Sequence, residues 1–350
     1  MLAQDSPIIR LKKIVVYFKR ILTLMTSFVY ASNFRTKEFV RMSFDSRQSI
    51  TRSTLIPATC LSLLMKITAI LSDYDGTLCS TSNVKDISSN KIPVELDATL
   101  SEISKYIPVC VVSSKDFGFL CDKITFARIV SCIMGIETIV LKRRVCNESV
   151  HIKKDSDLLF DAHLITDIDS LTDNSILLTS LAKEISQNFK ELAVDHKYTS
   201  KERILVGITI DYRHLEDWLS YKTKLEPFLY EMIQQTKSQL SSSVSKLYVE
   251  TYCTHPFLDI YGIKCDKGSA FDSVLKLLDM DRSKNRIMYL GDSENDNAAF
   301  AKADVSIGVH SDERLRARLN CQYNVDFDRL SLFLRRLSHN NFEFSDKLID

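Results

Sequence analysis

Residues 70–78 read Ile-Leu-Ser-Asp-Tyr-Asp-Gly-Thr-Leu, and this stretch decides the fold. The apolar run at residues 67–71 predicts a short buried strand that delivers two carboxylates, Asp73 and Asp75, onto a turn. Side chains two positions apart in a strand lie on the same face, so both acids can reach one site at the end of the strand. Gly76 supplies the backbone freedom for that turn. Two like charges held close together repel each other, and a bound cation would offset the repulsion.

Three further segments place polar side chains at the end of an apolar run or at the start of a helix. The first is residues 108–115, Pro-Val-Cys-Val-Val-Ser-Ser-Lys, a β-prone run that ends in hydroxyl groups and a cation. The second is residues 266–271, Asp-Lys-Gly-Ser-Ala-Phe, which predicts a helix start. The third is residues 287–296, in which Ile-Met-Tyr-Leu runs into Gly-Asp-Ser-Glu-Asn-Asp.

These four segments, in this order, resemble the four motifs of the haloacid dehalogenase (HAD) superfamily. Residues 73–77 match Asp-x-Asp-Gly-Thr, and residues 291–296 match Gly-Asp-x-x-Asn-Asp. The resemblance extends from about residue 65 to the C-terminus. It implies an α/β fold with a Rossmann-like, doubly wound parallel sheet, and it implies the activity of a phosphatase.

The spacing of the segments predicts the domain organisation. Alternation of β-branched apolar runs with helical patterns favours a parallel sheet with helices on both faces and a site at the carboxyl ends of the strands. About 150 residues separate the second motif from the third, whereas a crossover needs only about a dozen. We therefore expect a core built from residues 65–142 and 255–350, with an inserted α+β cap at 143–254. Such an insert resembles the cap of HAD subclass IIB, which includes trehalose-phosphate and mannosyl-phosphoglycerate phosphatases.

The resemblance also assigns the chemistry. It implies that Asp73 is the nucleophile and that Asp75 first protonates the leaving oxygen and then activates water. Mg²⁺ prefers oxygen ligands, and the expected ligands are the carboxylates of Asp73 and Asp292 with the backbone carbonyl of Asp75. Asp296 and Asn295 are expected to complete the metal site.

Two phosphate-binding residues follow from the same resemblance. Ser113 would donate a hydrogen bond to a phosphoryl oxygen, with Ser114 as the alternative. Lys267 would stabilise both the nucleophile and the transferring group. Lys264 competes with Lys267 for this role, and Lys267 is preferred because a glycine follows it and a helix starts there.

Four residues are candidates for contact with the leaving group. The Ser-Ser-Lys run that ends at Lys115 is closer to the Thr-Ser-Lys of mannosyl-phosphoglycerate phosphatases than to the Ser-Gly-Arg of trehalose-phosphate phosphatases. The Gly-Ile-Glu run ending at Glu137 and the Ile-Asp-Tyr-Arg run containing Asp211 and Arg213 resemble trehalose-phosphatase segments. Asp211 stands where that family has His. Arg213 also fits an ordinary surface ion pair.

The expected function is therefore Mg²⁺-dependent hydrolysis of the phosphate monoester of a sugar or similar small metabolite, through an aspartyl-phosphate intermediate. Two alternatives stay open: a phosphoglycolate-type phosphatase of small acids, and a non-catalytic metabolite-binding protein with the same fold. The expected partner is a small phosphorylated metabolite and not a nucleic acid, and a phosphatase that acts on small anions needs only a local basic site.

The composition is ordinary for a soluble globular protein. The 350 residues are 45% apolar and 26% charged, which allows two compact units. Nine scattered cysteines include no Cys-x-x-Cys pair, so we expect no zinc site and a reducing, cytoplasmic location.

Residues 1–64 differ in charge from the rest, with a net charge of +7 against −6. Their two apolar runs, residues 14–18 and 21–30, are split by charges, and neither reaches the roughly 20 residues that span a bilayer. We interpret this segment as a basic N-terminal extension, either disordered or produced by an upstream start assigned in error. Weak contact with a membrane surface stays open as an alternative.

Overall fold

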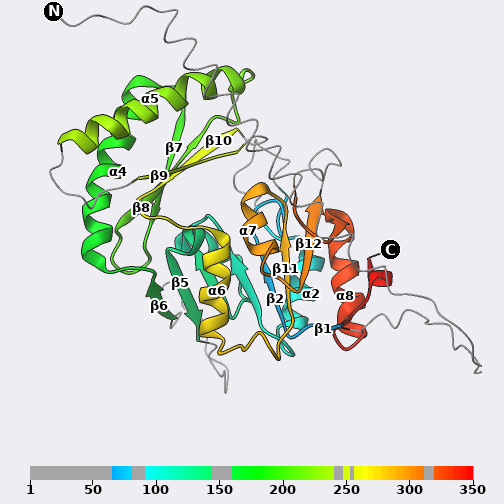
Figure 1. The fold of residues 1–350 in the computed structure, drawn as a ribbon. Coiled ribbons are helices and arrows are strands. Elements are labelled where there is room, and N and C mark those ends of the chain that lie inside the picture. Colours follow the sequence, from blue (N-terminus) through cyan, green and yellow to red (C-terminus); the bar gives the residue numbers. More distant parts are fainter. Residues whose placement is uncertain are drawn as a thin grey trace, which may run out of the picture. The chain divides into compact units, whose positions relative to one another are not determined.

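The structure is a computed structural model that describes residues 65–80, 91–142, 160–239, 247–252, 256–310 and 319–349 (Figure 1). The expected N-terminal extension, residues 1–64, lies outside this range, as does the expected start of the cap at 143–159. Among the described helices, none is both long and apolar enough to cross a membrane.

An eight-stranded sheet forms the centre of the core. In spatial order its strands are β13 (Tyr323–Asp326), β12 (Val305–His310), β11 (Ile287–Gly291), β2 (Ala69–Ser72), β3 (Val109–Val112), β4 (Ile129–Cys132), β5 (Glu137–Leu141) and β6 (Phe160–Leu164). All neighbours from β13 to β4 run parallel, whereas β5 is antiparallel to both β4 and β6. The carboxyl ends of β2, β3 and β11 therefore meet at one edge of the sheet.

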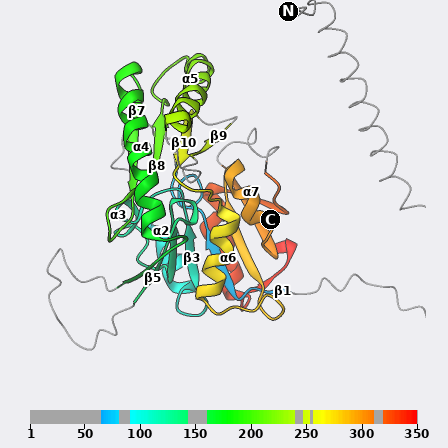
Figure 2. The same cartoon turned by 60° about the vertical axis from the view of Figure 1, so that its left-hand side comes forward.

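Both faces of this sheet are covered by helices, because its strands are apolar on both sides. In β3, Cys110 and Val112 pack with α6 (Lys267–Leu277), while Val109 and Val111 pack on the opposite face with α2 (Val94–Ile103) and α8 (Leu330–His339). Figure 2 shows α6 lying along one face of the strands. The predicted doubly wound α/β core is confirmed.

Short elements complete the core. Strand β1 (Met65–Lys66) pairs with β14 (Glu343–Phe344). The short helices are α3 (Phe117–Leu120), η2 (Ile133–Gly135), η3 (Glu294–Asp296), α7 (Asn297–Phe300), η5 (Phe327–Arg329) and η6 (Asp346–Leu348).

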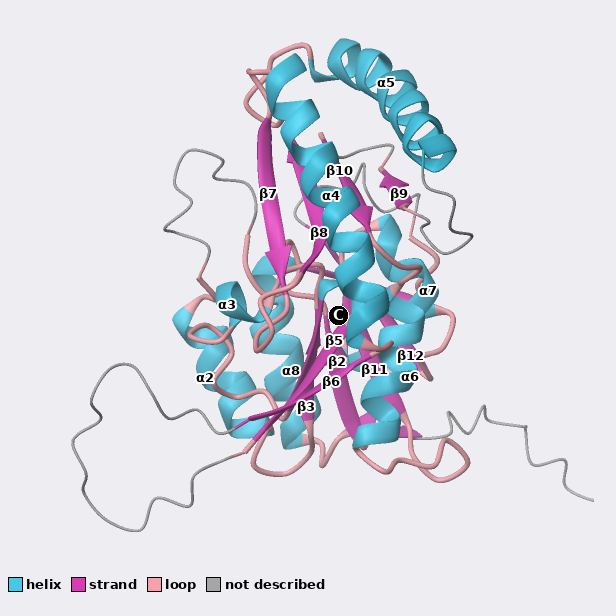
Figure 3. Cartoon of the chain, turned by 90° about the vertical axis from the view of Figure 1, so that its left-hand side faces the viewer, coloured by secondary structure: helices cyan, strands magenta, loops and turns pink. Residues whose placement is uncertain are grey.

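A second, four-stranded antiparallel sheet forms the cap. Its order is β7 (Ala193–Tyr198), β8 (Leu205–Asp211), β10 (Phe257–Tyr261) and β9 (Tyr248–Thr251). The helices α4 (Ile168–Asn188) and α5 (Trp218–Gln239) pack on one face of it, around Ile208, Ile210 and Ile260 (Figure 3). An α+β unit is thus inserted into the α/β core, as the sequence predicted.

The strand pairing bears on where the cap begins and ends. Strand β6 lies after the expected start at residue 143, yet it pairs with β5 in the large sheet. Strand β10 lies after the expected end at residue 254, yet it pairs with β8 and β9 in the small sheet. We therefore propose that the cap runs from Ile168 to Tyr261.

A buried ion pair lies on the face of the cap sheet opposite the helices. Lys197 Nζ is 3.0 Å from Asp259 Oδ1, and the two side chains are only 2% and 1% exposed. The Tyr252 hydroxyl donates to Asp259 Oδ2 at 2.8 Å, and the Thr209 hydroxyl donates to the other oxygen. Burial alone would raise the pKa of Asp259, but Lys197 and these donors hold it below its usual range.

We expect Lys197→Met to lower the free energy of unfolding by about 3–5 kcal/mol, because it leaves a buried carboxylate without its cation. The double variant Lys197→Met/Asp259→Leu should recover most of that loss, since it removes both charges. Urea unfolding of the three proteins measures this. A double variant as unstable as the single one would mean that shape, and not charge, controls this region.

Candidate active site

Asp73 occupies the carboxyl end of the central strand β2. Its backbone N–H donates to the Leu290 carbonyl at 2.9 Å, which extends the pairing of β2 with β11 by one residue. Because Ala69 and Leu71 face α6, Asp73 continues the same alternation and also points toward that helix. Its carboxylate oxygen Oδ1 lies 2.9 Å from Lys267 Nζ.

The turn after Asp73 carries Asp75 and packs against Asp292. Gly76 has φ +80°, and a Cβ at this position would lie 1.9 Å from Asp292 Oδ2, so only glycine fits here. The Thr77 hydroxyl donates to Asp292 Oδ1 at 3.3 Å. Asp75 Oδ2 lies 3.8 Å from Lys115 Nζ, and Asp75 Oδ1 accepts a weak hydrogen bond from the Cys79 thiol.

Lys267 is placed by the start of α6. The Asp266 side chain accepts from the Ser269 N–H at 2.7 Å, which caps the helix and makes Lys267 its first residue. The Lys267 side chain is 1% exposed, and its ammonium group bridges Asp73 Oδ1 at 2.9 Å and Asp296 Oδ1 at 2.8 Å. Burial alone would lower the pKa of Lys267, but the two carboxylates raise it.

Asp292 and Asp296 belong to the loop after β11. The Asp296 carboxylate accepts from the Tyr289 hydroxyl at 2.8 Å and from the backbone N–H groups of Asp292 and Ser293 at 3.1 and 3.0 Å. Asp296 therefore holds the loop in shape as well as contributing charge. Asn295 accepts from the Ser293 hydroxyl at 2.8 Å.

These acids form one cluster with the chemistry of a cation site. Asp73, Asp292 and Asp296 each offer an oxygen, and these oxygens lie within 4.8 Å of one another. Burial and neighbouring acids raise the pKa of Asp73 to about 7, despite Lys267, and raise that of Asp292 well above its usual range. Buried carboxylates whose charged forms are disfavoured in this way suit a hard cation with oxygen ligands, such as Mg²⁺.

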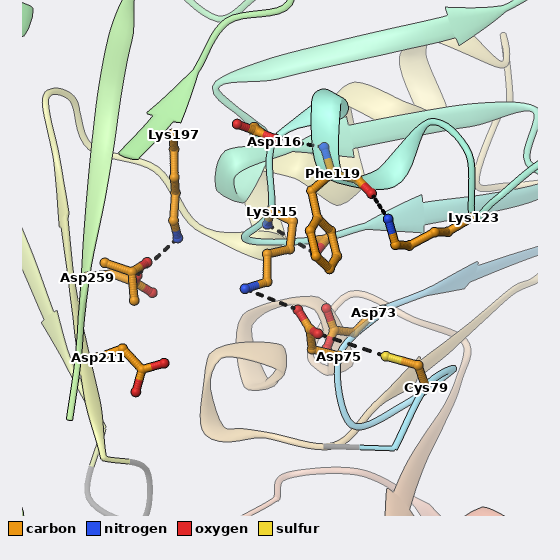
Figure 4. Close-up of polar contacts among 12 residues, drawn as sticks. Asp73, Asp75, Cys79, Lys115, Asp116, Phe119, Lys123, Lys197, Asp211 and Asp259 are labelled. Carbon is orange, nitrogen blue, oxygen red and sulfur yellow. Dashed lines mark hydrogen bonds and ion pairs between the residues drawn. The ribbon is translucent and has the colours of Figure 1, made fainter. Parts of the chain in front are cut away.

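Ser113, Ser114 and Lys115 follow β3 at the same edge. The buried Ser113 hydroxyl oxygen accepts from the Lys115 N–H at 3.2 Å, and its own proton can be donated to a ligand. Ser114 is half-buried in the same turn. Lys115 lies beside Asp75, and Figure 4 shows it extending toward that residue with Lys197 and Asp259 of the cap nearby.

Each of the other candidates for substrate contact has a partner within the protein. Arg213 Nη2 lies 2.6 Å from Asp211 Oδ2, and the Arg213 N–H donates to Asp211 Oδ1 at 2.9 Å, so the two residues pair with each other. Glu137 is completely buried and accepts hydrogen bonds from Ser200 of the cap.

Several residues of the site were not singled out from the sequence. Thr77 is part of the first motif and could have been found there. Tyr289 lies inside an apolar run, and Ser200 lies in an ordinary turn, so neither carries a local signal.

Comparison with known proteins gives the family of this chain. Residues 70–321 match the family model of the haloacid dehalogenase-like hydrolases. No curated protein matches the sequence. Among solved structures, a trehalose-6-phosphate phosphatase related protein is 15% identical, with 78% of this chain and 97% of that chain covered at a TM-score of 0.50. A haloacid dehalogenase-like hydrolase from Bacteroides thetaiotaomicron is 14% identical, with 78% and 100% covered at a TM-score of 0.52.

An α/β core with an inserted cap and buried acids at the carboxyl ends of β2 and β11 defines a hydrolase of the phosphatase type. The family match covers well over half of the chain, and the chain belongs to the haloacid dehalogenase-like hydrolases. The solved structures are too distant in sequence to show more than the fold.

Proposed function

We propose that this protein is a Mg²⁺-dependent phosphatase that hydrolyses the phosphate monoester of a sugar or a similar small metabolite. The observation that carries the proposal is the buried Asp73 carboxylate, held 2.9 Å from Lys267 and clustered with Asp292 and Asp296. Nucleophile, counter-charge and candidate metal ligands thus converge at one sheet edge. The arrangement suits displacement at phosphorus, where positioning and charge stabilisation do most of the catalysis.

In the first half-reaction, an Asp73 oxygen forms a bond to phosphorus and the bond from phosphorus to the leaving oxygen breaks. Asp75 gives its proton to that leaving oxygen, so the alcohol departs neutral. Lys267 favours the charged form of Asp73 and attracts the phosphoryl oxygens, while Ser113, or alternatively Ser114, donates a hydrogen bond to one of them. The product is an aspartyl phosphate on Asp73.

In the second half-reaction, Asp75, now a carboxylate, takes a proton from water. The water oxygen bonds to phosphorus, the bond to Asp73 breaks, and inorganic phosphate leaves. Mg²⁺ bound by Asp73, Asp292 and the Asp75 carbonyl, with Asp296 and Asn295 in support, would neutralise charge on the phosphoryl oxygens. Asp296 pairs with Lys267 and accepts from the Asp292 N–H, so it holds Lys267 and the loop after β11 in position.

The open face of the cap sheet favours a sugar over a small acid as the leaving group. Asp195, Thr209, Asp259 and Glu250 lie directly opposite one another across the four strands, on the face away from α4 and α5. Burial alone would lower the pKa of Lys115, but Asp75, Asp195 and Asp259 raise it. Asp259 and Thr209 are already paired within the protein, so the exposed carboxylates of Asp195 and Glu250 are the acceptors that would suit hydroxyl groups and repel a carboxylate. Lys115, Asp211 and Arg213 are our further candidates for contact with the substrate.

The test is a panel of phosphorylated metabolites assayed with Mg²⁺, including neutral sugar phosphates, phosphoglycolate and p-nitrophenyl phosphate. We expect the highest kcat/KM for a sugar phosphate, and we expect EDTA to abolish turnover and added Mg²⁺ to restore it. A preference for phosphoglycolate would support the small-acid alternative. Turnover that survives EDTA would contradict the metal assignment, and binding without turnover would support a non-catalytic role.

A further inference from the structure

We propose that Glu137 is a positioning residue that links the cap to the phosphate-binding loop through Ser200. This inference rests on the proposed function only in taking residues 113–115 as the phosphate-binding loop. It gives Glu137 a role different from the expected contact with sugar hydroxyls.

The link is a set of hydrogen bonds between core and cap. The Ser200 N–H lies 3.0 and 3.1 Å from the two Glu137 carboxylate oxygens, and the Ser200 hydroxyl donates to Oε1 at 2.7 Å. Ser200 lies in the turn between β7 and β8 of the cap, whereas Glu137 is the first residue of β5 in the core. Hydrogen bonds to a buried carboxylate are among the stronger ones in proteins.

Glu137 follows a strained turn that contacts the phosphate-binding loop. Ile133, Met134 and Gly135 have φ values of +51°, +56° and +95°. Such a backbone is strained at each non-glycine residue and is rare for a β-branched one. The turn is held by two bonds to the loop: the Ile133 N–H donates to the Lys115 carbonyl and the Met134 N–H to the Ser113 carbonyl, both at 3.0 Å.

The same turn also packs against the helix that carries Lys267. A Cβ at Gly135 would lie 2.9 Å from the Ala270 Cβ in α6, so the turn has no room to move toward that helix. The turn thus lies between the Ser113 loop and α6, and Glu137 is two residues beyond it. The turn therefore fixes Glu137 in position relative to the elements that hold the phosphate.

Glu137 also stands beside one of the two connections between core and cap. It is the register partner of Leu164 in β6, and the Ile165 N–H donates to the Ile136 carbonyl at 3.0 Å just before α4 begins. The β7–β8 hairpin makes a second contact beside the loop, from the Tyr198 N–H to Asp116 Oδ2 at 3.4 Å. Glu137 thus helps to hold the β7–β8 hairpin over the loop of residues 113–115.

A direct contact of Glu137 with substrate fits these observations less well. Its side chain is 0% exposed, and both carboxylate oxygens already accept from Ser200. A ligand would have to displace these bonds to reach it.

Ser200→Ala and Glu137→Gln test the proposal, with Ser283→Ala as the matched control. Ser283 donates its N–H and hydroxyl to Asp281 in the same pattern, at 2.9 and 2.8 Å, but precedes the amino end of β11, away from the site. For the best phosphorylated metabolite, we expect the two Ser200–Glu137 variants to lose roughly tenfold in kcat/KM, mainly through KM. Hydrolysis of p-nitrophenyl phosphate, which needs little from the cap, should stay within about twofold of wild type.

Hydrogen exchange at residues 198–204 gives a readout that does not depend on activity. We expect faster exchange in Glu137→Gln than in wild type, because the Ser200 N–H loses a charged acceptor, and no change in Ser283→Ala. Equal losses on both substrates, wild-type kinetics in both variants, or unchanged exchange would each overturn the proposal. If wild type prefers a substrate other than a sugar phosphate, the proposed function fails while the exchange result still decides the role of Glu137.

Discussion

Asp73→Asn is expected to abolish turnover while the fold stays intact. The change removes the attacking oxygen and a candidate metal ligand together but keeps the size of the side chain, so we expect a loss of roughly 10⁴-fold or more in kcat. The amide can still accept a hydrogen bond from Lys267, whose other partner, Asp296, is unchanged. Stability should therefore change far less than activity.

Steady-state assays with p-nitrophenyl phosphate and the best metabolite measure the loss, and thermal unfolding monitors the fold. Asp281→Asn is the matched control, because it makes the same chemical change in an exposed turn outside the site. Turnover within about tenfold of wild type would show that another residue attacks phosphorus.

Asp75→Asn is expected to slow hydrolysis of a metabolite by roughly 10²–10⁴-fold, since Asn can neither protonate the leaving oxygen nor accept a proton from water. With p-nitrophenyl phosphate the outcome should differ, because p-nitrophenolate leaves without a proton. The first half-reaction then proceeds, and the second is slow. We expect a burst of p-nitrophenolate, with phosphate trapped on Asp73.

Rapid-mixing kinetics measure the burst, and mass spectrometry of the quenched protein locates the phosphate. The double variant Asp73→Asn/Asp75→Asn should show neither burst nor label. A metabolite rate near wild type in Asp75→Asn would place the acid–base role on another residue, and Lys115 would be a candidate because its Nζ lies 3.8 Å from Asp75 Oδ2.

Much of the core follows from local patterns. Apolar runs long enough for one strand, each ending in polar residues, predicted β2, β3 and β11. Parallel strands then bring their carboxyl ends to one edge, so Asp73, Ser113 and Asp292 could be expected to meet before any contact was known. Gly76 is a case in which local sequence and tertiary contact agree, because it allows the turn and leaves room for Asp292.

The cap was harder to delimit from the sequence. The excess length between the second and third motifs predicted an insert, but strand patterns do not state which sheet a strand joins. Strands β6 and β10 have similar lengths and lie near the two expected boundaries, yet β6 pairs in the core and β10 in the cap. Pairing depends on partners far away in the chain, so composition at the boundary carries little information about it.

The sequence by itself determined the fold class, the family and the order of the acidic and basic residues along one sheet edge, because those depend on periodicity and on short motifs at strand ends. Only the tertiary structure decided which charged side chains have a partner and which residue that partner is. Lys197 and Asp259 are 62 positions apart, and Glu137 and Ser200 are 63 apart. Whether a buried carboxylate binds a ligand or holds two domains together depends on the hydrogen-bond donor that the fold brings to it. The sequence next to the carboxylate does not predict that donor, because the donor comes from a distant part of the chain.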